Sequence, residues 1–307
     1  CDTNKKSCYI TATHTFNIFI KDSQMLPNIN NASKLTGNSS RLEILKALVD
    51  WIQKDEFAVG RKNKKNKLIE YNWSPMFPTA KGWDERIKQF SYAQATPVLA
   101  FKNIRSDVAP IIKNLSALNP ELGAMQTIAW GGLQKKHYDF SMARAVIAKS
   151  QGKEIQGNIP MNSGWTKVAA LASMGGRNPT SAHQSIWDSR MSTSIIHRLD
   201  MLGTTPNIWE NIAAKLEFSA SYLTTSGRGG TRTGMRVFKN FKPKRNQLTT
   251  WSSHFWGSQL VIEIAGILNT PQYKYPKMPY YDIQAKKTIL RKWDVWGVGM
   301  VLFMDGY

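Results

Sequence analysis

The chain has 307 residues, a mass of 34.7 kDa and a hydrophobic share of 42 %, which allows one large domain or two intimate ones with a packed core. Lys and Arg number 41 against 21 Asp and Glu, so the net charge is +20 and the pI is near 9.9. This imbalance favours a polyanionic partner. Nucleic acid fits best, because neutralised phosphates release counterions and so supply sequence-independent affinity.

Cysteine count and hydropathy exclude several classes of protein. Cys1 and Cys8 are the only cysteines, which rules out a disulfide framework, a zinc ribbon and a four-cysteine iron–sulfur cluster. No apolar stretch reaches the roughly 18 residues of a membrane span, and the polar opening CDTNKKS is unlike a signal peptide. We therefore expect a cytoplasmic monomer with no membrane contact.

Hydrophobic periodicity predicts a mainly α-helical chain. The first helix is expected at 41–57, where Leu45, Leu48 and Ile52 share one face after the start signal Asn38-Ser39-Ser40. Further helices are predicted at 83–95, 104–118, 140–151, 164–174, 185–201, 206–220 and 251–269. Alternation in ITATHTFNIFI predicts a small β element near the N-terminus, and another short strand is predicted near 235–242.

Two loops carry dense positive charge, and we consider both as DNA contacts. The first loop, 61–67, includes Arg61, Lys62, Lys64, Lys65 and Lys67. The second, 224–247, is rich in glycine, has no acidic residue, and includes Arg228 and Arg232. Either loop could be a solvated surface segment or a segment that contacts phosphate.

The most informative passage runs from Ile159 to Leu199, with the sequence IPMNSGWTKVAALASMGGRNPTSAHQSIWDSRMSTSIIHRL. Its first part predicts a hairpin between two helices, with a tight turn through Asn162, Ser163 and Gly164. Backbone N–H groups at the N-terminus of a helix bind phosphate through unpaired donors and the helix dipole. We therefore expect residues of this turn to bind DNA phosphate: Asn162, Ser163, Gly164, Trp165 and Thr166.

This passage resembles the helix-hairpin-helix superfamily of base-excision DNA glycosylases (HhH-GPD). Ile159-Pro160 is similar to the family's leucine-proline and Gly164 to its last glycine, while Thr166-Lys167-Val168-Ala169 resembles a run of the 8-oxoguanine branch. Asp188-Ser189-Arg190-Met191 stands where the family has its aspartate helix start. The turn before Lys167 is longer than the family's, and Gly175-Gly176-Arg177 reads as an insertion.

The resemblance implies two helical subdomains around a cleft, with Asp188 and Lys167 as catalytic residues. A carboxylate beside C1′ stabilises the oxocarbenium-like sugar formed when the base leaves. A lysine facing the same carbon can form a Schiff base and then cleave the strand by β-elimination. Two alternatives stay open. Asp188 could be only a helix N-cap. If the pattern is aligned on Gly164 instead, Thr166 takes the lysine position, Lys167 lies on the surface, and water attacks.

We expect a DNA glycosylase that flips a modified or damaged base out of double-stranded DNA, with lyase activity if Lys167 attacks; the alternative is a non-catalytic DNA-binding module. The segments are 1–103, the hairpin core 104–203, and 204–307. No metal is expected, although the resemblance admits a monovalent cation at the hairpin. Whether the base is common damage or a hypermodified viral base, as in phage defence, stays open. Several aromatic residues could stack on it: Trp130, Trp165, Trp187, Trp251, Phe255 and Trp256.

Overall fold

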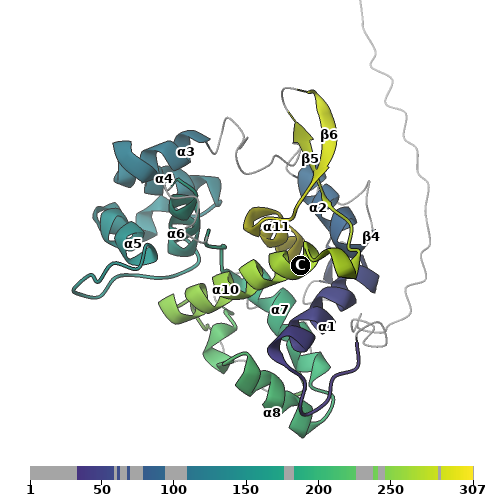
Figure 1. Ribbon diagram of the computed structural model, residues 1–307. Coiled ribbons are helices and arrows are strands. Elements are labelled where there is room, and N and C mark those ends of the chain that lie inside the picture. The colour runs from purple at the N-terminus through teal and green to yellow at the C-terminus, as the bar shows by residue number, and fades with distance from the viewer. Residues whose placement is uncertain are drawn as a thin grey trace, which may run out of the picture.

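The computed structural model describes residues 33–58, 61–62, 68–69, 79–93, 109–175, 183–225, 238–240, 246–282 and 285–306. Helices dominate this part of the chain, and short antiparallel strand pairs accompany them (Figure 1). The predicted mainly α fold is therefore confirmed. The strand expected in the first 20 residues lies outside the described residues. Of the strand expected near 235–242, residues 238–240 are described and form none.

The N-terminal part begins with a strongly capped helix, α1 (Arg41–Lys54). Ser40 Oγ accepts the Glu43 N–H at 3.3 Å, and Glu43 Oε2 accepts the Ser40 N–H at 2.6 Å, so a reciprocal capping box fixes its start. Helix α2 (Gly82–Ala93) packs beside it. Two short strand pairs lie between these helices in sequence, β1 (Glu56–Ala58) with β4 (Thr79–Lys81) and β2 (Arg61–Lys62) with β3 (Leu68–Ile69).

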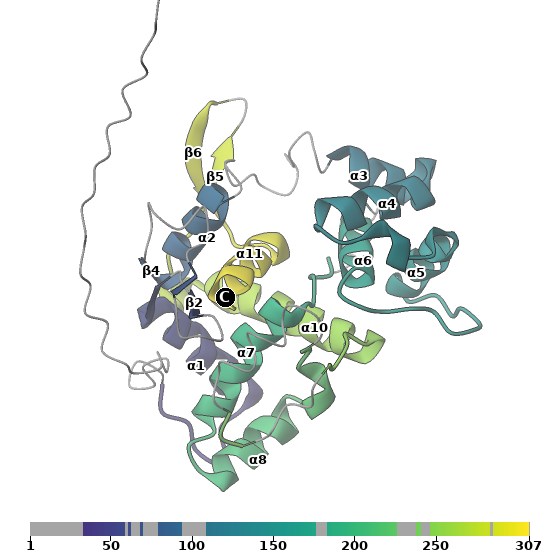
Figure 2. The ribbon, with the colours of Figure 1, turned by 180° about the vertical axis from the view of Figure 1, so that it is seen from behind.

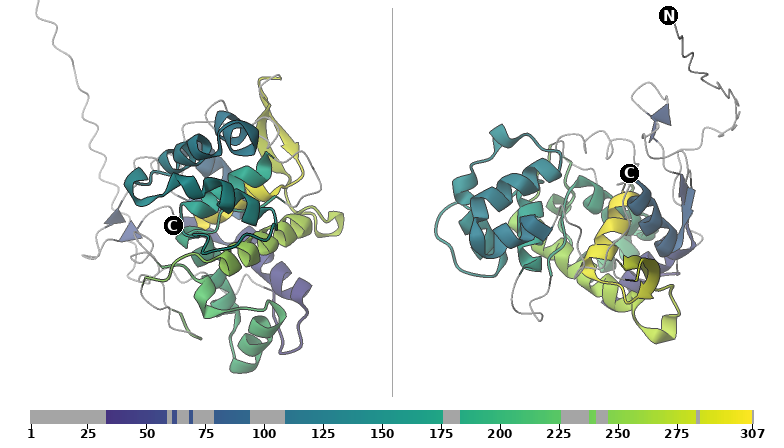
Figure 3. Two further views of the ribbon diagram at one scale, coloured as in Figure 1. Left: turned by 90° about the vertical axis from the view of Figure 1, so that its left-hand side faces the viewer. Right: turned by 90° about the horizontal axis from the view of Figure 1, so that it is seen from above.

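A second group of helices spans residues 109–174 and has its own hydrophobic cluster. It comprises α3 (Ala109–Lys113), a π-helical turn (Asn114–Leu118), α4 (Pro120–Trp130), α5 (Ala143–Ser150) and α6 (Trp165–Met174). Side chains such as Ile128, Val146 and Val168 form its core. Figure 3 shows this teal group beside the rest of the molecule. The sequence did not predict α4, whose apolar residues surround the helix and so give no amphipathic pattern.

The remaining helices share one core with α1 and α2. They are α7 (Ser189–Leu202), α8 (Pro206–Lys215), α10 (Trp251–Leu268) and α11 (Val295–Asp305). Their cluster joins Ile44 and Trp83 to Ile195, Ile264 and Val301. Segments far apart in sequence therefore build one core, as the two opposite views in Figures 1 and 2 show. In particular, α7 packs with α1 and α11.

A β-hairpin that the sequence did not predict precedes the last helix. Strand β5 (Met278–Asp282) pairs antiparallel with β6 (Lys287–Arg291), with Tyr280 opposite Ile289. Pro279 lies within the first strand, and proline normally argues against a strand. At the turn, Lys286 adopts a φ of 49°, a left-handed conformation that glycine or asparagine usually supplies. These two residues explain why the sequence pattern does not predict the hairpin.

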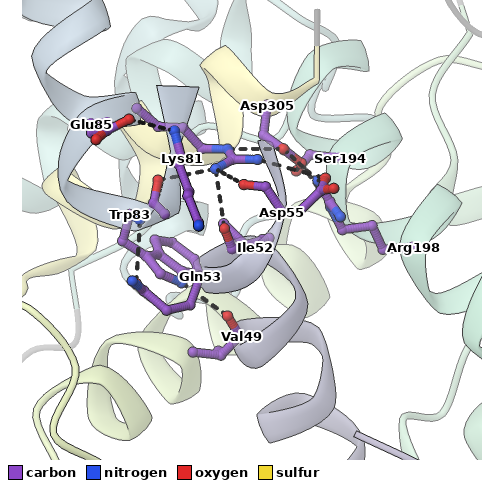
Figure 4. A network of polar contacts seen from close by, with 12 residues as sticks. Val49, Ile52, Gln53, Asp55, Lys81, Trp83, Glu85, Ser194, Arg198 and Asp305 are labelled. Atoms are coloured by element: carbon purple, nitrogen blue, oxygen red, sulfur yellow. Dashed lines mark hydrogen bonds and ion pairs between the residues drawn. The ribbon is translucent and has the colours of Figure 1, made fainter. Parts of the chain in front are cut away.

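Four buried charged side chains tie the two ends of the larger core together (Figure 4). Arg198 Nη2 donates to Asp55 Oδ2 at 3.0 Å and to Asp305 Oδ1 at 2.7 Å, and Arg86 Nε donates to Asp305 Oδ1 at 3.2 Å. Burial alone would raise the pKa of Asp305, but the guanidinium groups of Arg198 and Arg86 outweigh it and hold that pKa well below its usual range. The network fixes α2, α7 and α11 around the end of α1.

None of the helices in the described ranges is both long and apolar enough to cross a membrane.

Candidate functional site

Lys167 lies in the first turn of α6 with its side chain buried against the N-terminus of α7. Its exposed fraction is 8 %. The Nζ atom donates to Ser163 O at 2.7 Å and lies 3.5 Å from Asp188 Oδ2. A Cβ atom at Gly131 would lie 2.8 Å from Lys167 Cδ, so the backbone after α4 packs closely against the aliphatic part of the lysine side chain. The ammonium is thereby held at one place facing a carboxylate.

Asp188 uses its two carboxylate oxygens for two different purposes. Oδ1 caps α7 by accepting the Arg190 N–H at 3.0 Å and the Met191 N–H at 3.3 Å. Oδ2 faces Lys167, and the residue is 8 % exposed. Capping and an ion pair with the lysine are thus compatible, so the N-cap role does not exclude a catalytic one. The cap also orients the carboxylate, because both backbone donors fix one of its oxygens.

The geometry distinguishes the two alignments of the hairpin. Thr166 is fully buried, and its Oγ1 accepts the Trp187 N–H and bonds His254 Nδ1, both at 2.8 Å. Lys167, and not Thr166, faces Asp188. The alignment that leaves Lys167 on the surface therefore does not describe this fold. That Lys167 acts as a nucleophile remains a prediction.

The backbone N–H groups of the hairpin turn already form hydrogen bonds within the turn. Asn162 Oδ1 accepts the Gly164 N–H at 2.9 Å and the Trp165 N–H at 3.1 Å, and Asn162 O accepts the Thr166 N–H at 2.9 Å. The side chains of Trp165 and Thr166 are buried. A phosphate could reach these N–H groups only by displacing the turn's own oxygens. The expected phosphate contact by Gly164, Trp165 and Thr166 therefore lacks free donors, and Asn162 and Ser163 are the half-exposed residues of the turn.

The hairpin is also less tight than expected. Helix α5 ends at Ser150 and α6 begins at Trp165, so residues 151–164 connect two helices that pack against each other. The carbonyl oxygens of Asn162, Ser163 and Gly164 each accept an N–H group or the Lys167 ammonium. Of these three oxygens, only Ser163 O accepts from the Lys167 ammonium. Among the described residues, no three His, Cys, Asp or Glu side chains gather as metal ligands.

Most of the aromatic candidates are structural. Trp187 and Trp165 are buried, and the indole N–H groups of Trp251 and Trp256 donate to backbone oxygens of other elements. Two candidates are more exposed, Phe255 at 39 % and Trp130 at 36 %. Phe255 packs on Trp251, whereas Trp130 directly precedes Gly131, which touches Lys167.

A residue that the sequence analysis missed lies beside Trp130. Trp296 of α11 stacks on it, with ring centroids 6.4 Å apart and planes 28° apart. Trp296 also packs against both hydrophobic clusters. Trp296 therefore bridges the two clusters and stacks on the residue that precedes Gly131. Only the aromatic composition of WDVWGVGM could have indicated it.

Most of the basic residues predicted to contact DNA lie outside the residues that the structure describes. Lys64, Lys65, Arg228 and Arg232 lie beyond the described residues, and Arg61 and Lys62 form β2. Exposed cations that the sequence analysis did not consider lie on and beside the β5–β6 hairpin. They are Lys274, Lys277, Lys286, Lys287, Arg291 and Lys292.

Comparisons of the chain with protein-family models, with curated proteins and with solved structures find no match.

Proposed function

We propose that the protein is a DNA glycosylase of the helix-hairpin-helix type that also acts as a lyase. The observation that carries the proposal is the buried pair of Lys167 Nζ and Asp188 Oδ2, 3.5 Å apart at the starts of α6 and α7. A buried lysine beside a carboxylate is what a Schiff-base glycosylase requires, since one group attacks the sugar and the other stabilises its positive charge.

The chemistry divides between the two residues. The Asp188 carboxylate stabilises the oxocarbenium-like sugar as the N-glycosidic bond breaks and the base leaves with the bonding electrons. The Lys167 ammonium gives one proton to the departing base, and the amine so formed bonds to C1′; a second proton then passes from the nitrogen to the ring oxygen. Opening of the sugar ring gives a Schiff base. Loss of a proton from C2′ then expels the 3′ phosphate and cuts the strand.

We assign the two hydrophobic clusters to two subdomains, with the base pocket at their boundary. Support comes from Trp130 and Trp296, whose stacked rings lie at that boundary, and from Gly131, which joins Trp130 to the Lys167 stem. A flipped base needs an aromatic face on which to stack. Trp130 offers an exposed ring one residue before Gly131, which contacts the aliphatic part of the Lys167 side chain.

The partner that we propose is double-stranded DNA, bound by a monomer in the cytoplasm. The net charge of +20 supports a polyanion, and the exposed cations around the β5–β6 hairpin supply a described surface for phosphates. In Figures 1 and 2 this hairpin stands out from the helices at the top of the molecule.

A non-catalytic DNA-binding module is the second candidate. One observation favours it: Asp188 caps α7 and Lys167 donates to Ser163 O, so both residues have a structural partner without any reaction. Such a module would bind DNA but leave every base in place.

Borohydride trapping on abasic DNA separates these candidates without knowledge of the excised base. A duplex with a single abasic site presents the sugar aldehyde, and reduction of a Schiff base leaves a stable protein–DNA adduct. We expect an adduct whose peptide map identifies Lys167, and its loss in Lys167→Gln. Lys149→Gln is the matched control, since this lysine belongs to the same helical group but lies over Trp251. Failure of the wild-type protein to form the Lys167 adduct would refute the lyase.

The base itself requires a panel of duplexes. Each contains one modified base and is treated with hot alkali after incubation, so that abasic sites appear as breaks. Release of at least one base by the wild-type protein, lost in Asp188→Asn, supports the glycosylase. Binding without release across the panel supports the non-catalytic module.

A further inference from the structure

A buried chain of hydrogen bonds runs behind the Lys167–Asp188 pair and connects three helices. The Trp187 N–H donates to Thr166 Oγ1, Thr166 Oγ1 bonds His254 Nδ1, and His254 Nε2 bonds Gln184 Oε1, each at 2.8 Å. Gln184 Nε2 donates to Ser150 O. Thr166 and His254 are both fully buried.

The two ends of this chain fix the direction of every bond in it. The Ser150 carbonyl can only accept, so the Gln184 amide nitrogen faces it and the amide oxygen faces His254. His254 must then carry its proton on Nε2. Its Nδ1 is therefore an acceptor, which leaves the hydroxyl of Thr166 as the donor. With its proton given to His254, Thr166 Oγ1 accepts the Trp187 N–H at the other end.

Two residues of this series of hydrogen bonds are direct sequence neighbours of Lys167 and Asp188. Thr166 immediately precedes Lys167, and Trp187 immediately precedes Asp188. The bond between Thr166 and Trp187 thus joins the two segments one residue before each member of the ion pair. Apart from the ion pair itself, the hydrogen bonds described for the two residues stay within one segment, since Lys167 bonds within its own turn and Asp188 Oδ1 caps its own helix.

We propose that Thr166 and His254 are positioning residues that set the distance between the Lys167 amine and the Asp188 carboxylate. His254 accepts the Thr166 proton and so holds the hydroxyl in the one rotamer that can receive the Trp187 N–H. The inference rests on the proposed function for its catalytic meaning, but the positioning itself can be measured without any reaction.

Burial supports the required neutral form of the imidazole. Loss of solvent lowers the pKa of His254 to about 4, so the ring stays neutral at pH 7. Of its ring neighbours, Trp251 and Phe255 carry no charge, and its polar partners Thr166 and Gln184 are neutral as well. None of these described neighbours therefore favours an imidazolium.

The first test reads the tautomer in the wild-type protein and needs no variant. Nitrogen-15 NMR of histidine-labelled protein at pH 7 reports which ring nitrogen carries the proton. We expect a His254 ring protonated only at Nε2. A ring protonated at Nδ1, alone or together with Nε2, overturns the proposal because Thr166 could then not donate to it.

The second test measures Lys167 in variants of Thr166. Thr166→Val keeps the shape and removes the hydroxyl, Thr166→Ser restores the hydroxyl, and Thr193→Val removes another buried hydroxyl that bonds within α7. Limited acetylation of all lysines at pH 7, read by mass spectrometry, compares Lys167 with the other lysines of the same sample. We expect faster acetylation of Lys167 in Thr166→Val alone, because its amine moves away from Asp188.

The reaction provides the third readout. A displacement of reacting groups by about 1 Å can cost about 100-fold in rate, so Thr166→Val should trap abasic DNA roughly 10- to 100-fold more slowly with unchanged DNA affinity. Thr166→Ser should recover most of that rate, and Thr193→Val should keep it. Acetylation and trapping equal to wild type in a folded Thr166→Val protein overturn the positioning role. If wild-type protein does not trap at all, the proposed lyase fails, while the NMR and acetylation results still decide the inference.

Discussion

Ionisation of the buried His254 should make the folded state less stable as the pH falls from 7 to 5. In the folded protein, burial lowers the pKa of this imidazole from 6.5 to about 4. Between these two values the unfolded chain binds a proton that the folded chain does not. The stabilising contribution is therefore fully present above pH 6.5 and is lost as the pH falls toward 4.

The magnitude follows from the two pKa values. A difference of about 2.5 pKa units corresponds to about 3 kcal/mol when the full window is crossed, and about 2 kcal/mol of it is lost between pH 7 and pH 5. Burial raises the pKa of Asp200, so the contribution of this carboxyl to the pH dependence has the opposite sign. A comparison with a variant that lacks only the imidazole removes such background terms.

Urea unfolding at pH 7 and pH 5 provides the assay, with wild type and His254→Phe measured side by side. The variant is expected to be less stable at pH 7, because Thr166 and Gln184 lose their partner. Its free energy of unfolding should nevertheless change less with pH, by about 2 kcal/mol over this interval. Equal pH dependence in the two proteins would refute the reasoning.

Three further outcomes are expected. Asp188→Asn should abolish base release while DNA affinity is kept or improved, as measured by alkali-dependent cleavage and filter binding, because one negative charge near phosphate is removed; near-wild-type turnover would argue against its role. Trp130→Ala should weaken binding of duplex that carries an excisable base by about 1–3 kcal/mol, with little effect on unmodified duplex. Asp305→Ala leaves buried guanidinium groups unpaired and should lower the free energy of unfolding by about 3–5 kcal/mol in urea titrations, and a smaller loss would indicate that water reaches the network.

Local signals predicted the helices well where one face is apolar. Helix α1 begins directly after the predicted start signal at Ser40, whereas α7 begins at Ser189, after its cap Asp188, and not at 185 as its predicted range has it. Helix α4 was not predicted because its own apolar residues lie on all sides of the helix. The β5–β6 hairpin was not predicted because a proline lies in one strand and a lysine occupies its left-handed turn position.

The candidate site could be predicted only in part, because its contacts join distant segments. The run Thr166-Lys167 and the cap Asp188 were visible as motifs, but the choice between Thr166 and Lys167 depends on which way each side chain points from α6. His254 belongs to another helix, 88 positions beyond Thr166, and nothing in its local sequence marks it as a partner of the hairpin. Trp296 lies on α11, which packs against α7, and its stacking on Trp130 joins segments 166 positions apart.

The four-charge network also has a consequence for the order in which the chain can fold during synthesis. Arg86 and Arg198 leave the ribosome long before Asp305, which accepts hydrogen bonds from both and lies 107 positions after Arg198. Until that carboxylate arrives, closing the larger core would bury two guanidinium groups with Asp55 as the only carboxylate of the network. The helices of residues 109–174 have a separate core and carry no such dependence. During translation, residues 109–174 should therefore fold first, and the larger core should form only after α11 has been synthesised.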